Sequence, residues 1–180
     1  MADFMELVST RRSMRKFTED EVTAEQLNSV LEAARWTPSW ANTQCWEIVT
    51  VTRQDLKESL QQTLLKGNPA SKAMTQAPVV LAICGRKQTA GYEKGEASTK
   101  FGDWLLFDLG LVSQSISLAA HSQGLGSVIV GLLDHDAAAR VLEVPEGNEL
   151  VALIPLGHPA KEPKTPERRN IEDFTHSETW

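Results

Sequence analysis

The chain has 180 residues, a formal net charge of −6 and a hydrophobic content of 41%. This length suits one domain over residues 1–180, which would remove about 70% of its unfolded surface from water and needs no disulfides. The acidic balance argues against general nucleic-acid binding, and no segment approaches the ~20 apolar residues of a membrane span. Cys45 and Cys84 lack the spacing of a zinc site or a redox pair, and the N-terminus has no signal-peptide stretch. We therefore expect a reduced, cytoplasmic protein without a nucleic-acid or membrane partner.

A basic cluster follows the first predicted helix, which the apolar spacing places over residues 3–10. The next run, RRSMRKF at 11–17, gathers cations on an acidic chain. Cations at a helix C-terminus favour the helix dipole, and this accounts for one or two of them. Three arginines and Ser13 within five residues also form a set of charge-assisted donors. The run therefore predicts a site for an anion, and for a phosphate in particular.

A second helix is predicted from a capping box, Thr23 with Gln26, and should end near Trp36. The loop that follows, TPSWANTQCW at 37–46, combines turn formers with two tryptophans and several polar side chains. Each tryptophan alone is expected to be a packing residue. Together with the amides they suit contact with a flat heterocycle.

Alternation and apolar runs predict the strands of the fold. They place strands over 47–52, 79–84 and 150–157, and an amphipathic helix over 55–65. The polar, glycine-containing segment 85–103 is expected to be a mobile surface segment suited to a lid.

The stretch from Asp103 to Gly131 is predicted to form the centre of the fold. Its first part is apolar on nearly every side, which is typical of a helix buried all round. Gly124 suits a left-handed helix stop, 127–131 is predicted to be a short buried strand, and Asp134 or Asp136 is expected to cap a further helix. A small or weakly polar stripe on the central helix predicts close packing of another backbone, for which a second copy is a natural candidate. The stripe comprises Gly110, Ser113, Gln114, Ser117 and His121.

Motifs for several kinds of chemistry are absent from the sequence. Gly124-Leu125-Gly126 has no third glycine, and its order of helix then strand is opposite to that of a dinucleotide fingerprint. The four histidines lack metal spacing, and His121 is expected to be a hydrogen-bonded core residue. With so few acids, bases or nucleophiles to name, hard chemistry is best assigned to a bound organic cofactor.

Four motifs in order resemble the FMN-dependent nitroreductase family. They are RRSMRKF, TPSWANTQCW, DLGLVSQSISLAAHSQGLGS and LIPLGHPAKEPKTPERR, and they span most of the chain. The resemblance implies an α+β, nitroreductase-like fold with a central mixed β-sheet flanked by helices, assembled as an intertwined homodimer. It also implies FMN as cofactor and NAD(P)H as electron donor.

The resemblance assigns site residues motif by motif. Arg11, Arg12 and Ser13 are expected at the FMN phosphate, with Arg15 near the ring as an electrostatic stabiliser. The loop 37–46 is expected to cover the partner subunit's flavin, and the stretch after Gly126 to bring its backbone to the reactive edge. The remaining expected FMN-binding residues are Pro38, Ser39, Trp40 and Asn42 in the loop, Val128, Ile129, Val130 and Gly131 after the helix, and Arg168 and Arg169 near the C-terminus.

The activity expected from this resemblance is ping-pong reduction of nitroaromatics, quinones or similar electron-poor small molecules. Two alternatives stay open: another flavoenzyme task on the same fold, such as reductive dehalogenation or oxygen-dependent flavin chemistry, and a flavin-binding protein without turnover. The family often has a small residue at the position of Trp40 and a proline at that of Cys45. The physiological substrate, the choice between NADH and NADPH and the role of segment 85–103 also stay open.

Overall fold

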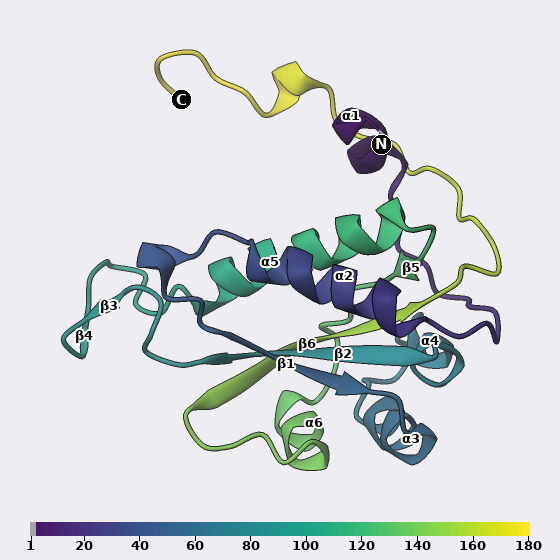
Figure 1. Ribbon diagram of the computed structural model, residues 1–180. Helices are drawn as coiled ribbons and strands as arrows, with labels where there is room; N and C mark the ends of the chain where they lie inside the picture. Colours follow the sequence, from purple (N-terminus) through teal and green to yellow (C-terminus); the bar gives the residue numbers. More distant parts are fainter. Residues whose placement is uncertain (1–2) are drawn as a thin grey trace.

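A four-stranded sheet with helices on both faces forms the body of the protein (Figure 1). The computed structural model describes residues 3–180. The strands lie in the order β1 (Trp46–Val51), β2 (Val79–Arg86), β6 (Asn148–Gly157) and β5 (Gly126–Ser127), and each neighbouring pair is antiparallel. The one parallel pairing within residues 3–180 is an isolated bridge between Ser13 and Ser127. The expected α+β class is confirmed.

Each face of the sheet is covered by its own set of helices. Helices α2 (Ala24–Arg35) and α5 (Leu105–Ser122) lie on one face, and α3 (Gln54–Gln62), α4 (Ser71–Gln76) and α6 (His135–Val141) lie on the other (Figure 1). Successive side chains of a strand point to opposite faces. In β2, alternate side chains therefore enter the two cores in turn, which explains why the strand is uniformly apolar in sequence.

Several helix ends form as predicted. The Thr23 hydroxyl accepts from the Gln26 N–H at 3.1 Å, and the Gln26 side chain accepts from the Thr23 N–H at 3.0 Å. The Asp134 carboxylate caps α6 by accepting from the Ala137 N–H at 2.9 Å. After α5, Gly124 has the expected left-handed conformation, with a φ of 74°.

The apolar pattern predicted that the central helix α5 is buried on all sides, but one side of it is exposed. Leu106 and Phe107 are 67% and 58% exposed, and Gly110 and Gln114 are exposed beside them. Ser113 and Ser117, in contrast, are buried within the same chain. The predicted small-residue stripe therefore has buried and exposed members. Its serines can be buried because their hydroxyls donate to backbone carbonyls one turn earlier. One face of α5, which we call the uncovered face, carries Leu106, Phe107, Gly110 and Gln114.

The predicted buried strand over 127–131 is also wrong in extent. β5 ends at Ser127, and only Val130 pairs further on, through an isolated bridge to Leu153. Ile129 is 49% exposed. If the register of β5 and β6 continued, Val128 would face Pro155, which has no N–H to donate to the ladder.

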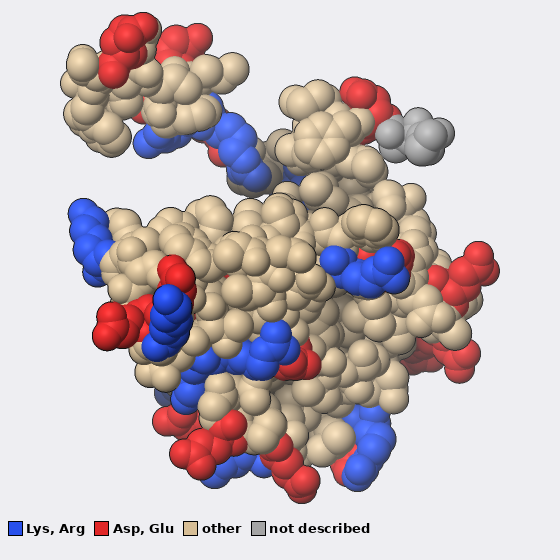
Figure 2. All heavy atoms as spheres, turned by 60° about the vertical axis from the view of Figure 1, so that its left-hand side comes forward, with Lys and Arg blue, Asp and Glu red and all other residues tan. Residues whose placement is uncertain are grey.

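Two segments extend from the body. A small hairpin of β3 (Tyr92–Glu93) and β4 (Glu96–Ala97) lies beyond one end of β2, in segment 85–103. Helix α1 (Phe4–Thr10) and the C-terminal segment with its short helix η2 (Ile171–Asp173) lie above the layer of α2 and α5 in the view of Figure 1. Figure 2 shows the C-terminal segment standing clear of the body, above a surface with few charged side chains.

The cysteines are free and buried, and they belong to separate cores, Cys45 with α5 and Cys84 with α3, α4 and α6. No helix within residues 3–180 is long and apolar enough to cross a membrane. In the same range, no group of three or more His, Cys, Asp and Glu residues is arranged to hold a metal ion.

Candidate functional site

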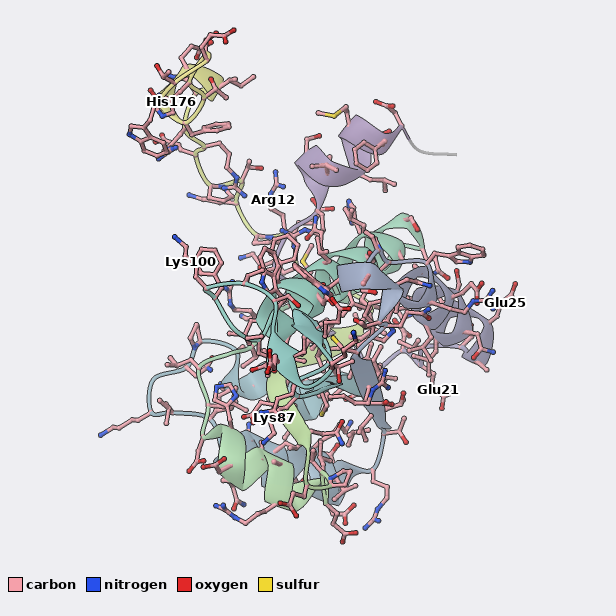
Figure 3. All side chains as sticks on the ribbon, turned by 90° about the vertical axis from the view of Figure 1, so that its left-hand side faces the viewer. Arg12, Glu21, Glu25, Lys87, Lys100 and His176 are labelled. Carbon is pink, nitrogen blue, oxygen red and sulfur yellow. The ribbon has the colours of Figure 1, made fainter. Side chains whose placement is uncertain are left out.

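A pocket of about 320 Å³, the arginine pocket, lies where the N-terminal basic run meets the C-terminal segment. The two segments run side by side, because the Thr18 N–H donates to the His158 carbonyl at 2.9 Å and the Arg12 guanidinium donates to the Thr165 hydroxyl at 2.9 Å. Figure 3 shows Arg12 at this junction. The lining residues are Arg11, Arg12, Ser13, Arg15, Pro163, Lys164, Pro166 and Arg168.

The arginine pocket is strongly electropositive. Within residues 3–180, no carboxylate lies within 4.0 Å of the guanidinium groups of Arg11, Arg12, Arg15 or Arg168. Partial burial lowers the pKa of Arg11, and the neighbouring charges of Arg12 and Arg168 lower it further. A bound anion would relieve this repulsion, so the pocket is suited to a phosphate.

His121 lies beside this charge cluster, at the end of α5. Its Nε2 is 2.8 Å from the Thr10 hydroxyl, which ties α1 to α5. Burial lowers the pKa of His121, and Arg11 and Arg12 lower it further. The imidazole is therefore neutral at pH 7. It is hydrogen-bonded, as the sequence predicted, but it is only half-buried and so is not the core residue that was expected.

A second pocket, of about 180 Å³, shares the lining residue Arg15 with the first and is called the strand-end pocket. Ile129 and Gly131 contribute backbone N–H groups that have no hydrogen-bond partner within residues 3–180. A Cβ added at Gly131 would meet nothing within 4 Å, so open space lies against the backbone here. The lining residues are Arg15, Asn68, Pro69, Ala70, Val128, Ile129, Val130, Gly131 and Leu132.

Arg15 lines both pockets and so joins them into one site. One end offers cations, and the other offers apolar side chains with unpaired backbone N–H groups. The joined site can therefore hold an elongated molecule with a phosphate at one end and a flat polar ring at the other.

Four lining residues of the strand-end pocket, Asn68, Pro69, Ala70 and Leu132, were not predicted from the sequence. Asn68 precedes Pro69, and its side chain accepts from the Ala70 N–H at 2.9 Å and donates to the Leu132 carbonyl at 2.9 Å. It thereby fixes the turn against the stretch after β5. The Asn-Pro dipeptide signals a turn, but nothing in the sequence indicates that this turn faces Val128.

The loop 37–46 lies elsewhere in the same chain. It contacts α5 in the first turn, where Asp108 accepts from the Trp40 N–H, and in the middle, where the Thr37 hydroxyl donates to the Ser115 hydroxyl at 2.8 Å. None of the loop residues lines the arginine pocket, which lies near His121 at the C-terminal end of α5, or the strand-end pocket. The structure therefore does not bring Pro38, Ser39, Trp40 and Asn42 to the pocket within one chain. Arg169 does not line the pocket either; its guanidinium lies 5.4 Å from the centre of the Phe174 ring.

The loop 37–46 is held in an unusual conformation. Ala41, Asn42 and Gln44 all have positive φ angles, of 43°, 56° and 47°, which side-chain-bearing residues rarely adopt. The buried carboxylate of Asp108 on α5 accepts from the Trp40 N–H, with both oxygens at 3.1 Å, and from the Cys45 thiol at 3.6 Å. Strained backbone of this kind persists only where its surroundings determine it, and it is concentrated at functional sites.

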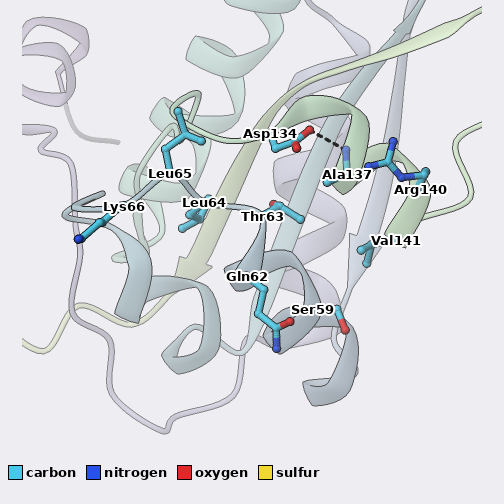
Figure 4. A pocket seen from close by; sticks show the side chains of 10 residues that line it. All are labelled: Ser59, Gln62, Thr63, Leu64, Leu65, Lys66, Asp134, Ala137, Arg140 and Val141. Carbon is cyan, nitrogen blue, oxygen red and sulfur yellow. Dashed lines mark hydrogen bonds between the residues drawn. The ribbon is translucent and has the colours of Figure 1, made fainter.

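A further pocket, of about 720 Å³, lies between α3 and α6 (Figure 4). Its polar residues include Lys66, Arg140 and Asp134, but the Asp134 carboxylate already caps α6. None of the predicted site residues lines it. We assign the functional site to the joined arginine and strand-end pockets, because four arginines and Lys164 line the arginine pocket, whereas Lys66 and Arg140 are the only cations of residues 3–180 that line the pocket between α3 and α6.

The joined site is suited to a phosphorylated, ring-containing ligand at the end of the sheet. Residues 8–158 match the model of the nitroreductase family. The chain belongs to this family.

Relatives and solved structures agree with this assignment. The chain is 30% identical to a Methanothermobacter thermautotrophicus protein with the provisional name NADH dehydrogenase/NAD(P)H nitroreductase, covering 99% of this chain and 88% of that protein. It is 31% identical to the NADPH-flavin oxidoreductase of Vibrio harveyi, covering 100% and 75%. Among solved structures, the NADPH:FMN oxidoreductase of Vibrio harveyi in complex with NAD+ has a TM-score of 0.81 and 26% identity, covering 98% of this chain and 77% of that one. The predicted family and its fold are confirmed.

Proposed function

We propose that the protein is an FMN-dependent NAD(P)H oxidoreductase in which residues 1–180 form a single flavin-binding domain. Its family and the names of its relatives, which include FMN reductases and NADPH-flavin oxidoreductases, support this chemistry. The observation that carries the proposal is the sharing of Arg15 between the arginine pocket and the strand-end pocket.

The residues fit FMN in two parts. Arg11, Arg12, Ser13 and Arg168 would hold the phosphate, because their cations converge on one pocket without carboxylate partners. Val128–Gly131 would lie along the flavin ring, with the free N–H groups of Ile129 and Gly131 available to its polar edge. Arg169 would contribute only if the C-terminal segment changes position.

When bound, FMN would accept a hydride from NAD(P)H and pass electrons to a nitroaromatic, quinone or similar acceptor. Arg15 would favour negative charge on the ring by placing a guanidinium beside it. The half-exposed Ile129 and Leu132 would shield one side of the ring from water while leaving the other open to donor and acceptor.

The site is completed by a second copy of the chain in this proposal. The uncovered face of α5 offers a surface on which an antiparallel α5 of the partner subunit can pack. Such pairing places the start of one helix beside the end of the other. It therefore brings the loop 37–46 of one chain, with Pro38, Ser39, Trp40 and Asn42, to the pocket of its partner. We also propose that the protein acts in the cytoplasm.

The test is to purify the protein with its cofactor, release the cofactor with acid and identify it by chromatography. We expect noncovalent FMN, and we expect the bound flavin to bleach under NADH or NADPH without oxygen. Recovery of FAD, or failure to bind any flavin on reconstitution, would exclude the proposal. Flavin that binds but is not bleached by either donor would favour a binding protein without turnover.

A further inference from the structure

A third pocket, of about 380 Å³, adjoins the arginine pocket on the side of the C-terminal segment. We call it the lysine pocket. It is lined by Ser13, Arg15, Lys16, Lys161, Glu162, Pro163 and Lys164, so that cations outnumber carboxylates four to one. This composition contrasts with that of the whole chain, which is acidic.

These cations have no ion-pair partners within residues 3–180. The four ion pairs of that range lie elsewhere and join Arg35 to Glu32, Arg53 to Asp55, Arg86 to Glu47 and Lys87 to Glu149. Acidic side chains are plentiful in this chain, yet none lies within 4.0 Å of the ammonium groups of Lys16, Lys161 or Lys164. Like charges held together in this way repel one another unless an anion lies between them.

The backbone fixes the spacing between the two segments that carry these cations. The Ala160 N–H donates to the Lys16 carbonyl at 3.0 Å, and Phe17 forms a bridge with Pro159. Phe17 is only 7% exposed, so this pairing is anchored in the core. Lys16 and Lys161 therefore stand on two paired segments, and the side chains of both are exposed.

The lysine pocket is also continuous with the proposed flavin site. It shares Ser13, Arg15 and Lys164 with the arginine pocket, and Arg15 with the strand-end pocket. FMN has a single phosphate, for which the arginine pocket suffices. The cations of the lysine pocket are thus available to a second phosphorylated molecule whose reactive end lies at the flavin.

We propose that the lysine pocket binds the 2′-phosphate of NADPH, and that it makes NADPH the preferred electron donor over NADH. The proposal rests on the function proposed above. The two donors differ only in this phosphate monoester, which carries nearly two negative charges at pH 7. Lysine ammonium groups bind phosphate as point charges, so Lys16, Lys161 and Lys164 distinguish the donors by charge.

The variant that tests this is Lys16→Gln/Lys161→Gln. Both lysines line the lysine pocket but neither of its two neighbours, so the proposed FMN contacts remain. Arg140→Gln is the matched control, because it removes an exposed cation on α6, on the other face of the sheet. FMN content is measured first for all three proteins.

Binding is measured by isothermal titration calorimetry of the FMN-loaded proteins with adenosine 2′,5′-bisphosphate and with AMP. We expect the wild type to bind the bisphosphate about 10-fold or more tightly than AMP, and the double variant to lose this preference. In steady-state kinetics, kcat/KM for NADPH should fall by about 10-fold or more, mainly through KM, while kcat/KM for NADH stays near the wild-type value. Arg140→Gln should match the wild type in both measurements.

Equal binding of the two probes by the wild type would overturn the proposal, as would an equal loss for NADPH and NADH in the double variant. A double variant that loses FMN would show that these lysines hold the flavin phosphate, which also overturns it. Failure of the proposed function has a different signature, in which neither donor reduces bound FMN. The calorimetric comparison does not depend on turnover and still tests the pocket in that case.

Discussion

We predict that Asp108 holds the loop 37–46 in place. Two replacements should separate the stability that its hydrogen bonds provide from the stability that is lost by burying its charge. The carboxylate is 1% exposed and accepts from the Trp40 N–H with both oxygens at 3.1 Å. Asp108→Leu removes the acceptor and leaves the Trp40 N–H without a partner. Asp108→Asn keeps one acceptor oxygen and removes the charge.

Two effects oppose each other at this position. Leaving a buried N–H unpaired costs about 1–3 kcal/mol. Burial raises the pKa of Asp108 above its ordinary value of 3.8, so the ionised carboxylate is itself costly, and its removal offsets part of that loss. We therefore expect Asp108→Asn to be within about 1 kcal/mol of the wild type, and Asp108→Leu to be about 1–3 kcal/mol less stable than Asp108→Asn.

The assay is urea unfolding at fixed protein concentration, where a loss of 2 kcal/mol shifts the midpoint by roughly 1 M for an m-value near 2 kcal/mol/M. The pH dependence gives a second readout. Because the folded-state pKa of Asp108 is raised, the stability that its protonation provides is present at low pH and is lost as the pH rises above about 3.8. Asp108→Asn should therefore gain stability relative to the wild type as the pH rises. Equal stability of Asn and Leu variants, or a relative loss by the Asn variant on raising the pH, would refute this reasoning.

Three further predictions concern the ring, the dimer and the thiol. Arg15→Ala should keep FMN bound, because Arg11, Arg12 and Arg168 remain at the phosphate. The variant should lower the flavin midpoint potential by a few tens of millivolts, since ~30 mV corresponds to ~1.4 kcal/mol for two electrons. An unchanged potential in a redox titration would show that Arg15 does not lie beside the ring. Gly110→Trp places a bulky side chain on the uncovered face of α5, so the two copies should no longer pack there. Analytical ultracentrifugation should then show a monomer with little bound flavin. A flavin-loaded monomer would contradict the proposed pairing. Burial and the nearby Asp108 raise the pKa of Cys45 to about 12, so the thiol of the folded protein should resist iodoacetamide at pH 8.5 and react only on unfolding. The same shift predicts that stability falls as the pH rises from about 9 toward 12. Mass spectrometry measures the alkylation, and rapid alkylation of the folded protein would refute the prediction.

The sequence predicts well those features that depend on neighbouring residues. The Thr23–Gln26 capping box, the Gly124 helix stop and the strand over β2 follow from local spacing and form with nearly the expected bounds. The basic run at 11–17 is also visible as an anomaly of charge, and the structure places Arg168 beside it. The roles of these residues in binding FMN stay predictions.

Features that depend on distant parts of the chain could not be predicted. An apolar helix pattern does not tell which side meets the same chain and which meets another. The predicted stripe therefore included Gly110 and Gln114 of the uncovered face of α5, but it missed Leu106 and Phe107 and wrongly added the buried Ser113 and Ser117. Asp108 is a single charged residue within an apolar run, and its partner, the Trp40 N–H, is a backbone group 68 residues away with no sequence signature. The short helix α4 and the turn at Asn68 escaped for a similar reason, because few residues carry the signal.

Comparing the binding of FMN with that of riboflavin, which lacks only the phosphate, tests whether the arginine pocket holds the FMN phosphate. Arg11→Gln suits this comparison, because the Arg11 side chain makes no hydrogen bond or ion pair within residues 3–180 whose loss would complicate the result. Dissociation constants from flavin fluorescence should show wild type binding FMN much more tightly than riboflavin, and Arg11→Gln weakening FMN by roughly 10- to 100-fold while leaving riboflavin unchanged. A wild type that binds FMN and riboflavin equally, or an Arg11→Gln variant that weakens both by the same factor, would contradict the account.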